Sequence, residues 1–229
     1  MKYTTLFFDA DETILDFERT ERNALEKTFS KYGLLYNEEI RKRYLEINDA
    51  LWASFERGEI TKETILYNRF RKLFKELSWD DVKKEFEEDF QKLLSAHGYT
   101  IDGAVELCKE LSKQFDIYIL TNGVAKVQHS RFQDSGLLPY VKDIFVSEEI
   151  GFQKPSEKYF EEVMKRVPEQ DKSKILMIGD SLNSDILGGN RAGIKACWYN
   201  PKRKENNTLA KPDFEVSDYE ELRNVIYEK

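Results

Sequence analysis

Two aspartates, two residues apart, close an apolar run near the start of the chain. Asp9 and Asp11 follow the segment TTLFF, and a second pair, Asp180 and Asp185, follows the apolar segment KILMIG. Carboxylates can ligate a hard cation, attack as nucleophiles, and exchange protons with a leaving group or with water. In an extended strand, Asp9 and Asp11 would point to the same side, because side chains alternate. The acids therefore indicate a metal site, a covalent catalyst or both.

A hydroxyl, an amide and a lysine follow two other apolar runs. Thr121 and Asn122 come directly after DIYIL, and Lys154 comes a little after DIFVS. These groups could donate hydrogen bonds to a phosphoryl oxygen and neutralise negative charge. Taken singly, an acid after a strand is usually a helix cap, Thr-Asn-Gly is usually a turn, and a lysine before a proline is usually solvated. Taken together, these residues are informative, because several separate apolar runs are each followed by residues that could take part in one phosphate or metal site.

The four carboxylates would repel one another in a single pocket and would be driven to protonate. A divalent cation relieves this repulsion. Mg²⁺ prefers oxygen ligands and commonly binds through one or two carboxylates and a substrate phosphate. We therefore expect Mg²⁺ as the cofactor and a small phosphate ester as the substrate.

The segments that would position these residues alternate between strands and helices. From residue 101 onward, apolar strands such as KILMIGD and KACWYN are separated by helical stretches such as 124–135 and 184–192. This alternation predicts an α/β fold with a parallel sheet that is covered by helices on both faces. Ligands of such sheets bind beyond the carboxyl ends of the strands, where the candidate residues lie.

A long helical region separates the first strand from the others. Between about residues 18 and 97, apolar residues recur every three or four positions, and no strand pattern interrupts them. We therefore predict an inserted all-helical domain at 18–97 and an α/β core domain built from 1–17 and 98–229.

The bulk composition narrows the class of partner. The chain has 229 residues and a net charge of -7, which disfavours a nucleic acid polymer or an anionic membrane as a partner. The apolar run at the N-terminus is too short for a signal peptide or a membrane span. Cys108 and Cys197 both lie in apolar segments, which favours buried thiols over a disulfide. We expect a reduced, cytoplasmic protein, and the sequence leaves the oligomeric state open.

The segments DADET, LTNG, QKP and GDSLNSD resemble, in order, the four motifs of the haloacid dehalogenase (HAD) superfamily. The resemblance covers essentially the whole chain. It implies a Rossmann-like parallel sheet with an inserted helical cap of the C1 type. It also implies a Mg²⁺-dependent phosphatase that acts through an aspartyl-phosphate intermediate.

The resemblance also implies a role for each motif residue. Asp9 would be the nucleophile and a metal ligand, and Asp11 would be the general acid/base, with its backbone carbonyl on the metal. Thr121 and Asn122 would hold the phosphoryl group, and Lys154 would steady the nucleophile. Asp180 and Asp185 would complete the metal site. Glu12 stands where the family usually has glycine, and we assign it no step.

Further segments, among them INDALWASFERGEIT and SEEIGFQKP, resemble the bacterial pyrimidine 5′-nucleotidases of this superfamily. Those enzymes hydrolyse nucleoside monophosphates and have been assigned a house-cleaning role. The cap residues Asn48, Trp52 and Arg69 could then contact the base, with Trp52 stacking on the ring. Because Trp52 also falls at helical spacing, packing in the core of the helical domain is an equally good interpretation.

Several alternatives share part of this pattern. A dehalogenase would not need Asp11. A phosphatase or phosphomutase acting on a sugar phosphate would share every core motif and differ only in the cap. A receiver domain has a phosphoacceptor Asp, a Thr and a Lys, but it carries the phosphoacceptor after a middle strand and has no helical insertion. A binding protein without catalysis would hardly need all four motifs.

Overall fold

The computed structural model describes residues 2–79 and 84–228. The chain divides into two compact units. We call Met1–Glu18 together with His97–Lys229 the core unit, and Arg19–Ala96 the helical unit. The helical unit is thus inserted into the core unit shortly after the first strand.

A six-stranded sheet forms the centre of the core unit, and every strand pairs in parallel with its neighbours. The spatial order is β3-β2-β1-β4-β5-β6. The strands are β1 (Thr5–Phe8), β2 (Asp116–Thr121), β3 (Asp143–Val146), β4 (Ile175–Gly179), β5 (Lys195–Tyr199) and β6 (Phe214–Val216). The first strand in the chain therefore lies in the middle of the sheet.

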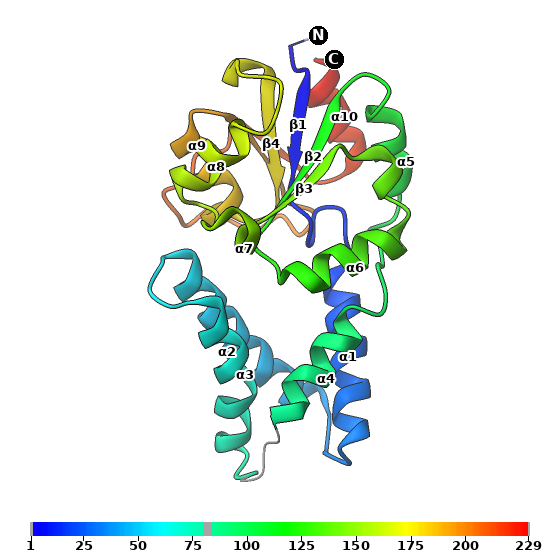
Figure 1. Cartoon of the computed structure of the whole chain (residues 1–229), viewed down its shortest axis with the longest axis vertical. Coiled ribbons are helices and arrows are strands. Elements are labelled where there is room, and N and C mark those ends of the chain that lie inside the picture. The colour runs from blue at the N-terminus through cyan, green and yellow to red at the C-terminus, as the bar shows by residue number, and fades with distance from the viewer. Residues whose placement is uncertain (1, 80–83, 229) are drawn as a thin grey trace. The chain divides into compact units, whose positions relative to one another are not determined.

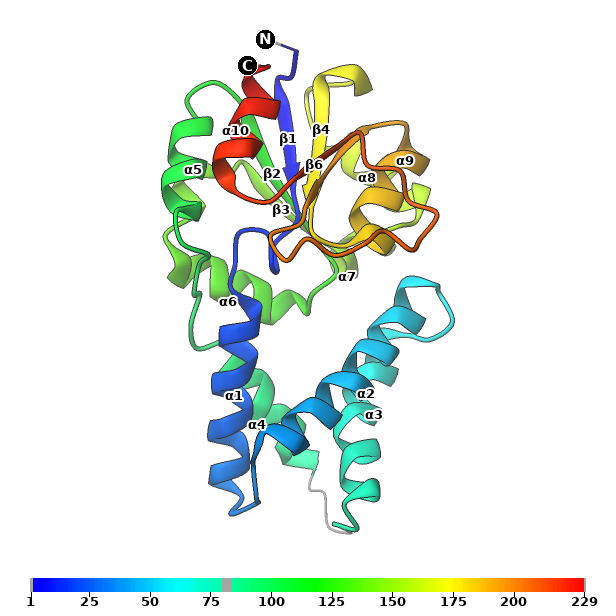
Figure 2. The same ribbon diagram turned by 180° about the vertical axis from the view of Figure 1, so that it is seen from behind.

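Helices cover both faces of this sheet (Figure 1 and Figure 2). One face packs against α5 (Ala104–Leu111), α6 (Ala125–Ser135) and α10 (Tyr219–Tyr227). The other packs against α8 (Glu157–Met164) and α9 (Leu187–Ala192). In β1, Leu6 and Phe8 join the first cluster and Phe7 the second, as side-chain alternation requires. The predicted α/β fold with a parallel sheet is confirmed.

The register of the sheet brings three strand ends to one level. Phe8, the last residue of β1, lies opposite Ile119 of β2 and Ile178 of β4. Asp9 therefore emerges beside the ends of both neighbouring strands. After β4, the expected helix over 184–192 is a π-helical turn at Leu182–Ile186 followed by α9. The short helix α7 (Ser147–Ile150) directly follows the end of β3.

The helical unit is built around aromatic rings. Phe29, Phe70 and Phe86 meet with ring centroids 4.7 to 6.4 Å apart. In the described part of this unit, the helices are α1 (Phe17–Lys31), which begins in the core unit, α2 (Glu38–Glu56), α3 (Lys62–Glu76) and α4 (Lys84–Leu94). Asn37 caps α2 and Thr61 caps α3, each through a side-chain oxygen. Apolar periodicity and capping thus account for the helices predicted here.

The cysteines and the helices can be compared with the sequence predictions. Cys108 and Cys197 are buried free thiols, as predicted, and burial raises the pKa of each to about 12. Across residues 2–79 and 84–228, no helix combines the length and apolar character needed to cross a bilayer.

Candidate active site

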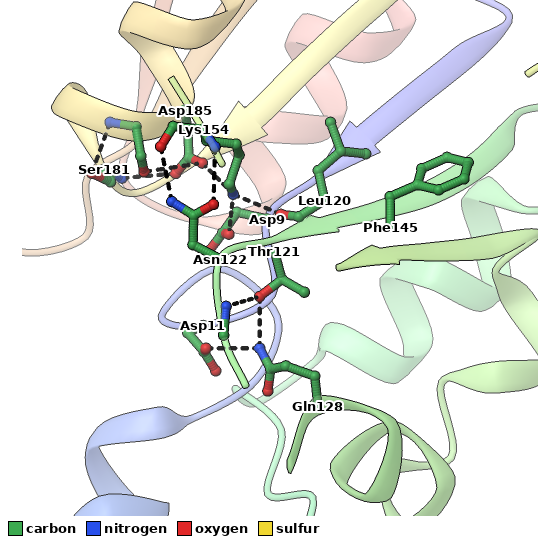
Figure 3. A network of polar contacts seen from close by, with 12 residues as sticks. Asp9, Asp11, Leu120, Thr121, Asn122, Gln128, Phe145, Lys154, Ser181 and Asp185 are labelled. Carbon is green, nitrogen blue, oxygen red and sulfur yellow. Dashed lines mark hydrogen bonds and ion pairs between the residues drawn. The ribbon is translucent and has the colours of Figure 1, made fainter. Parts of the chain in front are cut away.

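A buried lysine connects two of the predicted aspartates at the carboxyl ends of the strands (Figure 3). Asp9 directly follows β1, Lys154 lies between α7 and α8, and Asp185 lies in the π-helical turn after β4. The Lys154 Nζ donates to Asp9 Oδ1 at 2.5 Å and to Asp185 Oδ1 at 2.7 Å. Its third bond, at 2.6 Å, goes to the main-chain oxygen of Leu120. All three ammonium protons are used, so the amine is held in one place.

The electrostatics of this cluster are dominated by burial. Burial raises the pKa of Asp9 well above its usual range, and the cation of Lys154 only partly offsets this. For Asp180, burial and then the charge of Asp185 raise the pKa to about 8. Burial alone would lower the pKa of Lys154, but the carboxylates of Asp185 and Asp9 outweigh it and raise that pKa above its ordinary value. One cation thus faces several carboxylates, and the cluster favours additional positive charge.

Three carboxylates lie close enough together to ligate a cation. Oxygen atoms of Asp9, Asp180 and Asp185 all lie within 4.8 Å of one another. An all-oxygen donor set of this kind suits Mg²⁺ better than a softer transition metal. The residues present therefore fit Mg²⁺, with the three aspartates as the groups that would hold it.

Local backbone structure explains the position of Asp185. A side chain at Gly179, the last residue of β4, would collide with the Asp185 carboxyl group, so only glycine leaves room there. The Asp185 Oδ2 accepts a hydrogen bond from the main-chain N–H of Ser181 at 3.0 Å. The Ser181 side chain in turn accepts from the N–H of Ser184 at 3.2 Å. The turn after β4 thus folds Asp185 back towards the strand end.

Thr121 ends β2 and Asn122 directly follows it at the same rim, but their side chains make different contacts. The buried Thr121 Oγ1 accepts from Gln128 Nε2 at 2.8 Å and from the N–H of Gly123 at 3.0 Å. The Asn122 amide bonds both main-chain groups of Lys154, donating to its oxygen at 3.0 Å and accepting from its N–H at 2.9 Å. The Asn122 side chain thus positions Lys154, and its contact with a phosphoryl group stays a prediction.

Asp11 lies in a turn and not in the strand. β1 ends at Phe8, and the N–H groups of Ile14 and Leu15 both donate to the oxygen of Ala10. Strand alternation therefore does not extend to Asp11, contrary to the sequence argument. Its carboxylate instead contacts Gln128 and Arg131 of α6.

Gln128 and Arg131 were missed by sequence reasoning. Gln128 Nε2 donates to Asp11 Oδ2 at 2.9 Å, and Arg131 Nη1 donates to Asp11 Oδ1. A signal was present, because both residues fall within the buried stripe of α6 that contains Val127 and Phe132. Polar residues inside such a stripe need partners, and an acid is the natural one for arginine.

Glu12 occupies a left-handed backbone conformation with φ +56°. Glycine adopts this conformation without strain, which accounts for the glycine usual at this position. The Glu12 Oε1 accepts from the main-chain N–H of Glu18 at 2.7 Å, in the first turn of α1. Glu12 therefore satisfies one of the free N–H groups at the start of the helix that leads out of the core unit.

The three residues predicted to contact the base all lie in the helical unit. Asn48 is buried, and its Oδ1 has no hydrogen-bond partner among the described residues. Trp52 is half-buried and packs edge-on against Phe55 with centroids 5.7 Å apart. Arg69 is buried and bonds Glu87 through Nε at 2.9 Å and Nη2 at 2.5 Å. Their contact with a base stays a prediction.

Comparison with known proteins identifies the family of the chain. A family model of haloacid dehalogenase-like hydrolases matches residues 3–193. The chain is 41% identical to the HAD-hydrolase YfnB of Bacillus subtilis over 225 residues, covering 98% of this chain and 96% of that protein. The crystal structure of YfnB bound to magnesium superposes with a TM-score of 0.94 and covers 99% of both chains.

Two further relatives carry a named activity. The pyrimidine 5′-nucleotidase PynA of Streptococcus pneumoniae is 37% identical over 99% of this chain and 96% of its own length. The pyrimidine 5′-nucleotidase YjjG of Escherichia coli is 32% identical over 99% of both. The predicted resemblance to these nucleotidases is confirmed. The chain belongs to the haloacid dehalogenase-like hydrolase family and is a hydrolytic enzyme.

Proposed function

We propose that the protein is a Mg²⁺-dependent phosphomonoesterase that hydrolyses nucleoside monophosphates, with pyrimidine nucleotides as its main substrates. The observation that carries the proposal is the buried Asp9–Lys154–Asp185 cluster beside Asp180. It combines a fixed carboxylate with a cation and a set of oxygen ligands, as phosphoryl transfer requires. The activity printed for PynA and YjjG supports the choice of substrate.

In the proposed reaction, a carboxylate oxygen of Asp9 attacks phosphorus. A new O–P bond forms as the bond to the leaving oxygen breaks, and Asp11 gives its proton to that oxygen. Water then attacks the phosphorus, its proton passes to Asp11, and the O–P bond to Asp9 breaks. Bound Mg²⁺ would supply positive charge that offsets the aspartates and the phosphate. Thr121 donates to a phosphoryl oxygen, and Lys154 keeps Asp9 oriented.

Asp11 favours this reaction over dehalogenation, because hydrolysis of a carboxylic ester intermediate needs no acid at that position. A phosphatase or phosphomutase acting on a sugar phosphate remains the second candidate, since it would use the same core residues. A mutase returns the phosphoryl group to a sugar, whereas a phosphatase releases it. Phosphate release therefore separates these alternatives.

The test is a panel assay of phosphate release with pyrimidine and purine nucleoside monophosphates and with sugar phosphates. We expect the highest kcat/KM with pyrimidine nucleotides, loss of activity on chelation, and recovery when Mg²⁺ is added. Asp9→Asn should abolish turnover, while Asp102→Asn, which alters an exposed aspartate of the core unit, should not. Higher kcat/KM with sugar phosphates would contradict the nucleotidase assignment. Full turnover by Asp9→Asn would contradict the assigned nucleophile.

We also propose that the enzyme works in the cytoplasm. The support is the pair of buried, free thiols, which suits a reducing compartment. The negative net charge supports a small-molecule substrate in place of a nucleic acid polymer.

A further inference from the structure

We propose that Gln128 and Arg131 are positioning residues that hold the Asp11 carboxylate at the place from which it exchanges protons with the leaving group and with water. This inference rests on the proposed function, because it assigns a purpose to residues that surround the proposed acid/base. Its basis is a closed set of contacts on one side of α6, which the motifs of the sequence do not include.

Each oxygen of Asp11 has its own partner. Arg131 Nη1 donates to Oδ1, and Gln128 Nε2 donates to Oδ2 at 2.9 Å. The two partners also bond each other, since Arg131 Nη1 donates to Gln128 Oε1 at 2.9 Å. Three side chains from two segments thus form a closed triangle. Such a triangle leaves Asp11 little rotamer freedom, although its side chain is 29% exposed.

Gln128 also connects this triangle to the phosphoryl site. The same Nε2 that bonds Asp11 donates to Thr121 Oγ1 at 2.8 Å. Figure 3 shows the Gln128 amide lying between these two side chains. Asp11 is therefore held one amide group away from the hydroxyl proposed to bind the phosphoryl group. A general acid must lie within hydrogen-bond reach of the leaving oxygen, so a place beside the phosphoryl site suits this role.

The backbone makes room for this arrangement. A Cβ at Gly123 would lie 2.7 Å from the Gln128 side-chain atoms Cγ, Cδ and Nε2, closer than such contacts normally occur. The glycine that follows Thr121 and Asn122 therefore allows the Gln128 amide to lie against the loop. Any larger residue would push this amide away from Asp11.

Arg131 is not the residue that stability alone would favour. Its side chain is fully buried, and its Nε and Nη2 have no hydrogen-bond partner among the described residues. The guanidinium also packs over the Phe17 ring, 5.2 Å from the centroid. An apolar side chain often replaces a buried ion pair without loss of stability. Orientation of Asp11 gives the buried charge a function that packing does not.

The test compares two leaving groups. The ribose alkoxide of a nucleotide must receive a proton as it departs, whereas para-nitrophenolate leaves without one. Since kcat/KM reports the first irreversible step, loss of acid catalysis should lower it for the nucleotide and spare the aryl ester. We expect Gln128→Met and Arg131→Met to lower kcat/KM for the nucleotide by about 10²-fold and to change it little for para-nitrophenyl phosphate.

Three controls keep this test specific. His129→Gln changes a half-exposed residue of the same helix, which pairs with Glu149 and not with Asp11, and should leave activity on both substrates unaffected. Arg131→Lys keeps the charge and should recover part of the nucleotide activity. Asp11→Asn should show the same leaving-group pattern, and adding Gln128→Met to it should cause no further loss, because the two residues then act as one unit.

Equal losses on both substrates, or full additivity with Asp11→Asn, would overturn the inference and leave only a structural role. If Arg131→Met fails to fold, the Gln128→Met result decides alone. A wild-type enzyme that releases phosphate from neither substrate would contradict the proposed function, and this inference with it.

Discussion

Glu21 should make the stability of the protein depend on pH. It lies in α1 within the helical unit and is 4% exposed, and Tyr44 donates to its Oε1 at 3.2 Å. Burial raises the pKa of Glu21 to about 7, although the charge of Arg69 and the bond from Tyr44 oppose the change. Asp49 adds to the increase, and Arg41 reduces it.

The size of the effect follows from linkage. One pKa unit corresponds to about 1.4 kcal/mol. A carboxyl whose pKa rises from 4.5 in the unfolded chain to about 7 in the fold therefore destabilises the fold by about 3 kcal/mol once it is ionised. Below pH 4.5 the Glu21 carboxyl is protonated in both the folded and the unfolded state, so the full stability of the fold is retained. About 3 kcal/mol of this stability is lost as the pH rises from 4.5 through about 7, because Glu21 ionises in the unfolded chain before it ionises in the fold.

Glu21→Gln removes this dependence. We expect the free energy of unfolding of the variant, relative to wild type, to increase by about 2 to 3 kcal/mol between about pH 5 and about pH 8. Urea unfolding followed by circular dichroism measures it. Glu26→Gln, which alters an exposed residue of the same helix, is the matched control. Parallel pH curves for wild type and Glu21→Gln would refute the assignment of a buried carboxyl with a raised pKa.

Three further predictions concern single residues. Glu12→Gly should be more stable to urea than Glu12→Ala by about 1 kcal/mol, because glycine accepts the left-handed backbone; equal stability would contradict this. Gly179→Ala should weaken Mg²⁺ binding about 10-fold or more by displacing Asp185, as titration calorimetry can measure, and unchanged affinity would contradict the role of the glycine. Trp52→Ala should raise KM for nucleotides more than for an aryl phosphate, and equal effects would favour a packing role.

The core fold was predictable because its strands are short apolar runs with polar residues at their ends. Parallel pairing brings those ends to one edge, so the sequence alone predicts that Asp9, Thr121, Lys154 and Asp185 form one group. The contact between Lys154 and Asp9 joins residues 145 positions apart. The sheet brings the strand ends to one edge, and the family resemblance implied that Lys154 steadies the nucleophile.

The remaining contacts depend on geometry that spacing does not encode. The bond between the Asn122 side chain and the Lys154 backbone follows from the shape of two loops. Gln128 and Arg131 fall in the buried stripe of α6, which signals that they need polar partners, but their spacing does not identify Asp11 as that partner. The left-handed turn at Glu12 was hidden for a similar reason, since glutamate carries no signal for such a turn.

Rapid acid quench during turnover of a nucleoside monophosphate with labelled phosphate tests directly whether Asp9 forms a covalent phosphoenzyme. We predict that label will be recovered on the peptide that contains Asp9, that it will appear before free phosphate reaches its steady rate, and that Asp9→Asn will lack it. Phosphate release without any labelled enzyme, or label on a peptide that lacks Asp9, would contradict the account.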